Sequence, residues 1–330
     1  MHLRPPHGAP ARLIALTAAA AALAGCGTTG ASEEEAAPAE GYPVTVSECD
    51  REVTVDAPPE RAVTLNQHAT EVMLALGLED RMVGTAYLDD AVLPEYEQAY
   101  EEVPVLADEY PSFEDLLAAE PDFAYAGYPG SAFDEAEGRG RDALEDAGMT
   151  TYGSLEQCAD EVGVETSHQE IRNIGELFGV EDRAEELIAG IDERLAETDS
   201  RMEGVEPVDV LVVDNVDTTV FTSGGKGIGT DIIERAGGRN VFDDVDQVFS
   251  DVSIEQAADR GPEAIVFYDY GSITVEEKIQ AVKDDPLLSG TEAVREERFA
   301  VLPLSSAVVG VRIGDAVADV ADQLHPGEDG

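Results

Sequence analysis

Basic residues are scarce in this sequence of 330 residues. Lysine and arginine together number 20 against 71 aspartates and glutamates, which gives a formal net charge of −51. Proteins that bind nucleic acid through its phosphates need clustered lysine and arginine side chains, so nucleic acid is excluded as a partner. The excess of acid is typical of a heavily solvated surface. A strongly anionic small molecule would need a local basic pocket to bind here.

Histidines and catalytic motifs are also few. No histidine stands at metal-ligand spacing from another; the five are His2, His7, His68, His168 and His325. Glycine follows Lys226 in the glycine-rich loop at residues 224–229, where a phosphate-binding loop requires serine or threonine. The sequence also has no nucleophile elbow and no convincing catalytic triad. We therefore predict that the protein is not an enzyme, and we expect no metal site and no cofactor.

The N-terminal apolar run is too short to span a membrane stably. Arg4 and Arg12 precede this run, which ends in Leu23-Ala24-Gly25-Cys26. These four residues resemble a bacterial lipobox, in which the cysteine is lipidated. We predict a signal peptide over residues 1–25 and a polar, flexible tether over residues 26–41. The protein would then be exported and lipid-anchored on the outer face of the cytoplasmic membrane.

Cysteine is limited to three residues. If Cys26 carries the lipid, Cys49 and Cys158 remain. Outside the cytoplasm such a pair is usually a disulfide, and we favour this interpretation over two separate buried thiols.

Short strands alternate with short helices through most of the chain, which predicts parallel sheets with helices on both faces. Between two such regions, residues 181–203 form one long helical pattern. We predict an α/β protein of two Rossmann-like lobes, residues 42–178 and 206–330, joined by a helix within residues 179–205. The apolar stripe expected to pack this helix against both lobes is Ala184, Leu187, Ile188, Ile191 and Leu195.

Two spacings recur in the same order in both lobes, which indicates a duplication. A Thr-acid pair lies six to seven residues before a glycine that ends a helix. A Ser-x-Glu triplet begins nine residues before a proline that precedes a strand. The matching sets are Thr70-Glu71, Gly77, Ser112, Glu114 and Pro121 in the first lobe, and Thr230-Asp231, Gly237, Ser253, Glu255 and Pro262 in the second.

Residues 42–330 resemble the substrate-binding proteins of ABC importers, and most closely the class with a helical backbone that serves ferric siderophores, haem and cobalamin. The segments that carry this resemblance are PERAVTLNQHATEVMLALGLEDRMVG (59–84), YPSFEDLLAAEPDFAYAG (110–127), TDIIERAGGRNVF (230–242) and ADQLHP (321–326).

The resemblance implies a ligand held between the lobes, little domain closure, and delivery to an ABC permease and its ATPase. It also implies an acidic residue on each lobe that pairs with arginine of the permease. We assign these contacts to Glu71 and Asp231, and we expect a monomer.

Ligand contacts are expected beyond the carboxyl ends of the parallel strands. The candidates are Asn66, His68, Tyr87, Tyr128, Ser131, Phe133, Lys226, Tyr268, Tyr270 and Arg312. Because bases are few among them, a neutral or cationic hydroxamate chelate of iron is favoured over a catecholate. Cobalamin or a related corrinoid is the main alternative, and haem could bind through tyrosine or histidine. A surface sensor or an enzyme on the same fold is less favoured.

Overall fold

The computed structural model describes residues 39–327, so the predicted signal peptide and the lipidation site Cys26 lie outside the described residues. The described chain begins with an antiparallel hairpin of β1 (Val44–Glu48) and β2 (Arg51–Val55). No helix within residues 39–327 is both long and apolar enough to cross a membrane.

The N-terminal lobe is built on a five-stranded sheet in the order β5-β4-β3-β6-β7, and every neighbouring pair is parallel. Its strands are β3 (Ala62–Leu65), β4 (Met82–Ala86), β5 (Val105–Ala107), β6 (Phe123–Ala126) and β7 (Thr150–Gly153). Its helices are α1 (Gln67–Ala75), α2 (Glu97–Tyr100), α3 (Phe113–Ala118), α4 (Pro129–Ala132), α5 (Arg141–Asp146) and α6 (Val164–Phe178). The central strands β3 and β6 are buried along their whole length, as expected of a sheet covered on both faces.

The C-terminal lobe is built on a four-stranded parallel sheet in the order β11-β8-β13-β14. Its strands are β8 (Val208–Val213), β11 (Gly238–Asn240), β13 (Ala264–Asp269) and β14 (Phe299–Pro303). A small antiparallel sheet beside it contains β9 (Asn215–Val216), β10 (Thr219–Ser223) and β12 (Phe249–Ser253). Its helices are α8 (Ile228–Arg235), α9 (Ile254–Asp259), α10 (Val275–Asp284), α11 (Glu292–Arg295) and α12 (Ile313–Leu324).

The repeat seen in the sequence is also a repeat of topology. The order β4-β3-β6-β7 in the first sheet corresponds to β11-β8-β13-β14 in the second. Gly77 and Gly237 follow the equivalent helices α1 and α8 with φ of 64° and 77°, a conformation that favours glycine. Ser112 and Ser253 accept hydrogen bonds from backbone amides at the starts of α3 and α9.

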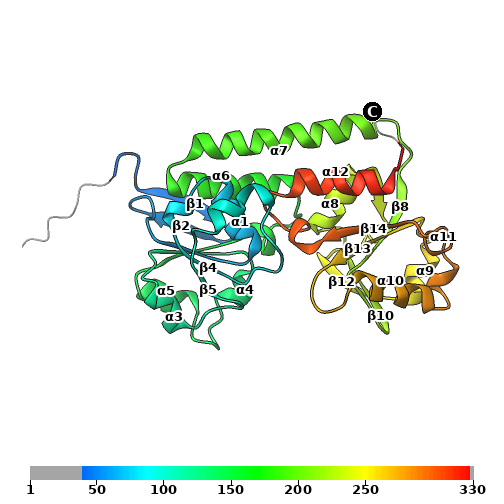
Figure 1. Ribbon diagram of the computed structural model, residues 1–330, viewed down its shortest axis with the longest axis horizontal. Helices are drawn as coiled ribbons and strands as arrows, with labels where there is room; N and C mark the ends of the chain where they lie inside the picture. The colour runs from blue at the N-terminus through cyan, green and yellow to red at the C-terminus, as the bar shows by residue number, and fades with distance from the viewer. Residues whose placement is uncertain (1–38, 328–330) are drawn as a thin grey trace, which may run out of the picture. The chain divides into compact units, whose positions relative to one another are not determined.

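In the sequence, the long helix α7 (Glu181–Met202) comes after the last strand of the first lobe and before the first strand of the second. In space it packs along both α6 and α12, as Figure 1 shows. Its buried side chains are Ala184, Ile188, Ile191, Leu195 and Thr198. Four of these belong to the predicted stripe, and Leu187 is partly buried beside them. One apolar core continues through both lobes and includes residues of α1, α7 and α12.

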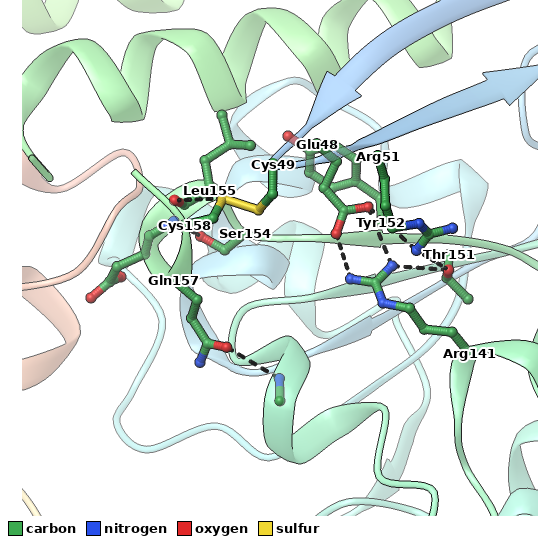
Figure 2. A network of polar contacts seen from close by, with 12 residues as sticks. Glu48, Cys49, Arg51, Arg141, Thr151, Tyr152, Ser154, Leu155, Gln157 and Cys158 are labelled. Atoms are coloured by element: carbon green, nitrogen blue, oxygen red, sulfur yellow. Dashed lines mark hydrogen bonds and ion pairs between the residues drawn. A yellow bond between two sulfur atoms is a disulfide. The ribbon is translucent and has the colours of Figure 1, made fainter. Parts of the chain in front are cut away.

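The predicted disulfide between Cys49 and Cys158 is confirmed, with a Cα–Cα distance of 5.5 Å. It joins the turn of the β1–β2 hairpin to the segment that follows β7, and Figure 2 shows the polar contacts around it. Glu48, which is 2% exposed, forms an ion pair there with Arg141. Arg51 of β2 also pairs with Glu145 of α5 at 2.7 Å, so one covalent bond and two ion pairs hold the hairpin to the N-terminal lobe.

Candidate functional site

Polar and aromatic side chains gather where the strands of the N-terminal lobe end. The side-chain oxygen of Asn66, directly after β3, accepts hydrogen bonds from the Tyr110 hydroxyl at 3.0 Å and the Tyr128 amide at 3.2 Å. Tyr87, directly after β4, stacks on Tyr110 with ring centroids 4.6 Å apart. Asn66 and Tyr87 have φ of 87° and 58°, values that non-glycine residues rarely adopt. Such strained backbone is concentrated at functional sites, which makes this edge the leading candidate.

Arg139 gives this edge a positive charge. Its guanidinium lies 5.3 Å from the centre of the Tyr110 ring and donates to the backbone carbonyls of Ser131 and Ala132. The residue is 7% exposed, so its charge is held in place beside the tyrosines.

The C-terminal lobe contributes Tyr270, which follows β13. Its hydroxyl donates to the two carboxylate oxygens of Asp214, at 3.0 and 3.2 Å, and Asp214 follows β8. The Lys278 ammonium lies 5.0 Å from the centre of the Tyr270 ring. Burial raises the pKa of the Asp214 carboxyl. At 37% exposure, the Tyr270 ring is accessible from solvent.

The tyrosines of the two lobes are close enough to influence one another electrostatically. Burial raises the pKa of Tyr270 to about 12, with further contributions from Asp214 and from Asp89 of the N-terminal lobe. Burial likewise raises the pKa of Tyr128, with contributions from Glu156, Asp89 and Tyr270. Asp89 therefore lies near tyrosines of both lobes. We refer to Tyr87, Tyr110, Tyr128 and Tyr270 together as the tyrosine site.

A separate groove of about 540 Å³ lies between α1, α7 and α12 and is lined by residues such as Leu93, Leu187 and Ile191. Its cations are already engaged: Arg183 donates to the carbonyls of Leu76 and Gly77, and Arg194 pairs with Asp315. We place the candidate site at the tyrosines rather than in this groove. Ligands of parallel α/β sheets bind at the carboxyl ends of strands, and the strained residues Asn66 and Tyr87 are there.

Not every predicted ligand contact lies at the tyrosine site. Phe133 is 7% exposed and lies under the Arg141 guanidinium, and Tyr268 is fully buried in the core. Lys226 forms an ion pair with Asp246 at 2.8 Å. Phe133 and Tyr268 are corrections to the prediction, because their side chains are enclosed. The Lys226 side chain is 36% exposed, so its role as a ligand contact stays a prediction. Ser131 is exposed and contributes its carbonyl to Arg139.

His68 packs edge-on against Tyr128, with ring centroids 4.9 Å apart. The side chain is 2% exposed, and burial lowers its pKa to about 4. It is therefore a neutral group beneath the site at neutral pH.

The structure corrects the role predicted for Glu71. Its carboxylate is 1% exposed and forms a two-point ion pair with Arg312, with both N–O distances 2.6 Å. The same carboxylate accepts from the Leu93 amide at 2.9 Å. A carboxylate enclosed in this way is not available to an arginine of another protein, and Arg312, predicted to contact ligand, is engaged by it.

Asp231 is only partly accessible. One oxygen accepts a hydrogen bond from the Val164 amide at 2.8 Å, and the other accepts one from Arg235 at 3.1 Å. Its side chain therefore faces the N-terminus of α6.

Three residues of the candidate site were missed in the sequence: Tyr110, Asp89 and Asp214. Tyr110 comes three residues after β5, an edge strand of three residues that the sequence pattern did not reveal. Asp89 and Asp214 are two of 71 acids, and only their positions after β4 and β8 could have singled them out.

Two carboxyl groups near the site have strongly raised pKa values. Burial raises the pKa of Glu156 to about 7, although the Val309 amide donates to it at 3.0 Å. Burial also raises the pKa of Glu170 to about 7, although Tyr125, Leu155 and Ser154 donate to it. Both groups bind a proton more tightly in the folded protein than in the unfolded chain, where a glutamate titrates near 4.3.

We expect Glu156→Gln to weaken the pH dependence of stability. Since the folded pKa is raised, the folded state binds more protons between about pH 4.3 and 7, and stability falls as pH rises through that window. The loss for one such group across this window is up to about 4 kcal/mol. Thermal unfolding between pH 5 and 8 should show a smaller loss for Glu156→Gln than for the unsubstituted protein. Glu197→Gln, at an exposed acid on α7, is the control. Parallel curves for all three proteins would contradict this expectation.

Two α/β lobes that share one long helix, with tyrosines at the carboxyl ends of strands in both lobes, define a solute-binding protein. The chain belongs to the periplasmic binding protein family, whose model matches residues 63–305.

Relatives and solved structures agree with this assignment. An uncharacterized ABC transporter substrate-binding lipoprotein of Bacillus subtilis is 25% identical over 320 residues, covering 94% of this chain and 96% of that protein. A vitamin B12-binding protein of Vibrio vulnificus is 27% identical over 215 residues, covering 63% of this chain and 71% of that protein.

The crystal structure of a periplasmic binding protein from Veillonella parvula is 30% identical and superposes with a TM-score of 0.78, covering 83% of this chain and 94% of that one. A structure from Saccharomonospora viridis, described as an ABC-type Fe3+-hydroxamate transport system, is 25% identical with a TM-score of 0.72. It covers 86% of this chain and 99% of that one.

Proposed function

We propose that this protein is the extracytoplasmic, lipid-anchored ligand-capturing component of an ABC importer, and that it binds a ferric hydroxamate siderophore at the tyrosine site. The protein acts as a monomer that delivers its ligand to a permease and ATPase. The observation that carries the proposal is that Tyr87 and Tyr128 of one lobe and Tyr270 of the other directly follow strands of their sheets, with Tyr110 stacked on Tyr87. Capture of a solute, rather than catalysis, is the role of the family.

The chemistry of the site suits a large, oxygen-rich and weakly charged ligand. Tyrosines offer flat apolar surface together with a polar hydroxyl. Arg139 and Lys278 provide positive charge, but Asp89, Asp214 and Glu156 lie among the same tyrosines. These acids would repel a highly anionic catecholate chelate. They would not repel a neutral or cationic hydroxamate chelate. The relative from S. viridis supports the same class.

A corrinoid is the second candidate. The observation in its favour is that vitamin B12-binding proteins of Vibrio species match this chain at 26–27% identity. A corrinoid is also bulky, and its amide side chains could donate hydrogen bonds to Asp89 and Asp214.

Titration of the purified protein separates these two ligands. We expect a ferric hydroxamate to quench tyrosine fluorescence at micromolar concentrations or below, and we expect Tyr110→Ala to weaken binding by about tenfold or more, because it removes the ring on which Tyr87 stacks and the donor to Asn66. Phe299→Ala, at an aromatic of β14 remote from the site, is the control for general damage. Tight binding of cyanocobalamin with no response to hydroxamates would overturn the first choice in favour of the second. No response to either ligand would contradict both.

For the permease contact, we propose a different pair of acids from Glu71 and Asp231. Glu114 in α3 and Glu255 in α9 occupy equivalent positions in the repeat, each two residues after a capping serine. Both carboxylates are exposed, and neither has an ion-pair partner within residues 39–327. In Figure 1, α3 and α9 lie on the side of the two sheets away from α7. Each lobe therefore has one exposed glutamate at this repeat position, and both glutamates belong to helices on the side of the sheets away from α7.

A further inference from the structure

Glu71 and Asp231 are both engaged by the opposite lobe. Glu71 belongs to α1 of the N-terminal lobe, and its partner Arg312 is the residue that precedes α12 of the C-terminal lobe. Both side chains are buried, at 1% and 8% exposure. The contact joins residues 241 positions apart in the sequence.

Asp231 makes the corresponding contact in the other direction. It belongs to α8 of the C-terminal lobe and accepts a hydrogen bond from the amide of Val164, the first residue of α6 in the N-terminal lobe. A Cβ atom on the preceding Gly163 would lie 2.5 Å from the Asp231 carboxylate, so the close approach requires glycine there. Asp231 thus takes the place of the side-chain cap that Gly163 cannot provide.

The two contacts are related by the repeat. Helices α1 and α8 occupy equivalent places in their lobes, and α6 and α12 are the helices that follow the equivalent strands β7 and β14. In each case an acid on the first helix of one lobe holds the N-terminus of the last helix of the other. A negative charge at a helix N-terminus is favourable on its own, but that effect does not require the two helices to come from opposite lobes.

Neighbouring hydrogen bonds extend both contacts. Beside the first, Ser305 donates to Asp90 at 3.1 Å, and the Arg312 guanidinium donates to the Ala91 carbonyl at 2.8 Å. Beside the second, the Val162 amide donates to the Lys226 carbonyl at 3.0 Å. Each acid therefore lies within a small polar interface rather than in an isolated pair.

We propose that Glu71 and Asp231 are reciprocal inter-lobe latches. They are positioning residues: by holding the lobes together, they fix the tyrosines of the N-terminal lobe relative to Tyr270 of the C-terminal lobe. Two latches at equivalent places resist both a hinge opening and a twist about α7, whereas α7 alone would leave the twist free. This role accounts for acids at equivalent repeat positions without any external partner.

The distance between the lobes tests the proposal without any ligand. Azide-bearing residues in place of Leu117 in α3 and Leu287 before α11 would carry a donor and an acceptor dye in the full chain, since both leucines are exposed. Single-molecule energy transfer should then show one narrow population for the unsubstituted protein. We expect Glu71→Gln and Asp231→Ala each to raise the population outside this peak by about tenfold or more, and the double variant to raise it further.

Glu48→Gln is the matched control. Glu48 is 2% exposed and forms a buried pair with Arg141, but both residues belong to the N-terminal lobe (Figure 2). It should lower the melting temperature and leave the distance distribution narrow. If Glu71→Gln fails to fold, Asp231→Ala still tests the proposal, because the Asp231 side chain is partly exposed and alanine removes the acceptor of the Val164 amide. Unchanged distributions in the folded latch variants, or equal broadening by Glu48→Gln, would overturn the proposal.

Discussion

Replacing Glu114 and Glu255 together with arginine is expected to reduce uptake by about a hundredfold or more and to leave ligand affinity unchanged. Each substitution places a positive charge where the proposed docking meets arginine of the permease, and like charges brought together across an interface cost several kcal/mol. Each residue is an exposed position near the start of a short helix, so the fold should tolerate the change. Uptake of labelled ligand in cells that lack the native protein, together with titration of the purified variant, measures both quantities.

Glu186→Arg with Glu197→Arg on α7 is the matched control for this prediction. It changes net charge by the same amount at two exposed acids, but on the opposite side of the molecule from α3 and α9 (Figure 1). Near-normal uptake by the control is expected. If the control and the Glu114/Glu255 variant lose uptake equally, a general effect of surface charge would replace docking as the explanation. Normal uptake by the Glu114/Glu255 variant would remove these residues from the interface.

Much of the fold could be predicted from the sequence because its signals are local. A serine cap, a glycine with positive φ and an apolar stripe at helical spacing each act within a few residues. Ser112, Gly77 and Ile188 therefore marked their elements correctly, and their recurrence indicated a duplicated sheet. The sequence contains no such local signal for the strands β5, β11 and β12. They are short, partly exposed or interrupted by glycine and charge, and only pairing with a neighbouring strand makes them strands.

The candidate site was predicted less completely because its contacts are long-range. The rule that ligands bind beyond strand ends selected Asn66, Tyr87, Tyr128 and Tyr270, which lie at the candidate site, since it requires only the strand positions. Their contact with ligand stays a prediction. Whether a side chain faces the site or the core depends on packing, which placed Tyr268 inside although it comes from the same strand end as Tyr270.

Glu71 is a second residue whose surroundings depend on long-range contacts. Its partner Arg312 is 241 residues away, and no spacing in the sequence connects the two. The equivalence of Glu71 and Asp231 in the repeat was real, but an acid at a repeated position can face the other lobe as readily as another protein. Burial distinguishes these possibilities, and burial is a property of the folded chain.

Breaking the buried pair of Glu71 and Arg312 is expected to lower stability more than breaking any other ion pair between the lobes. Removing one partner leaves the other charge enclosed, so Glu71→Met and Arg312→Met should each lower the free energy of unfolding by about 3–5 kcal/mol. The double variant should lose less than the sum of the two, because no enclosed charge remains unpaired, although the Leu93 amide still loses its acceptor. Urea unfolding followed by circular dichroism at neutral pH measures all three values.

The exposed pair of Arg194 and Asp315, which joins α7 to α12, provides the comparison. Its side chains are 54% and 42% exposed, so Asp315→Asn should cost at most about 1 kcal/mol. Losses of similar size for the exposed and the buried pair would mean that enclosure does not strengthen the Glu71–Arg312 contact. Additive losses in the double variant would mean that the two side chains act through other neighbours. The predicted pattern, large single losses with strong coupling, requires that each charge depend on the other across the boundary between the lobes.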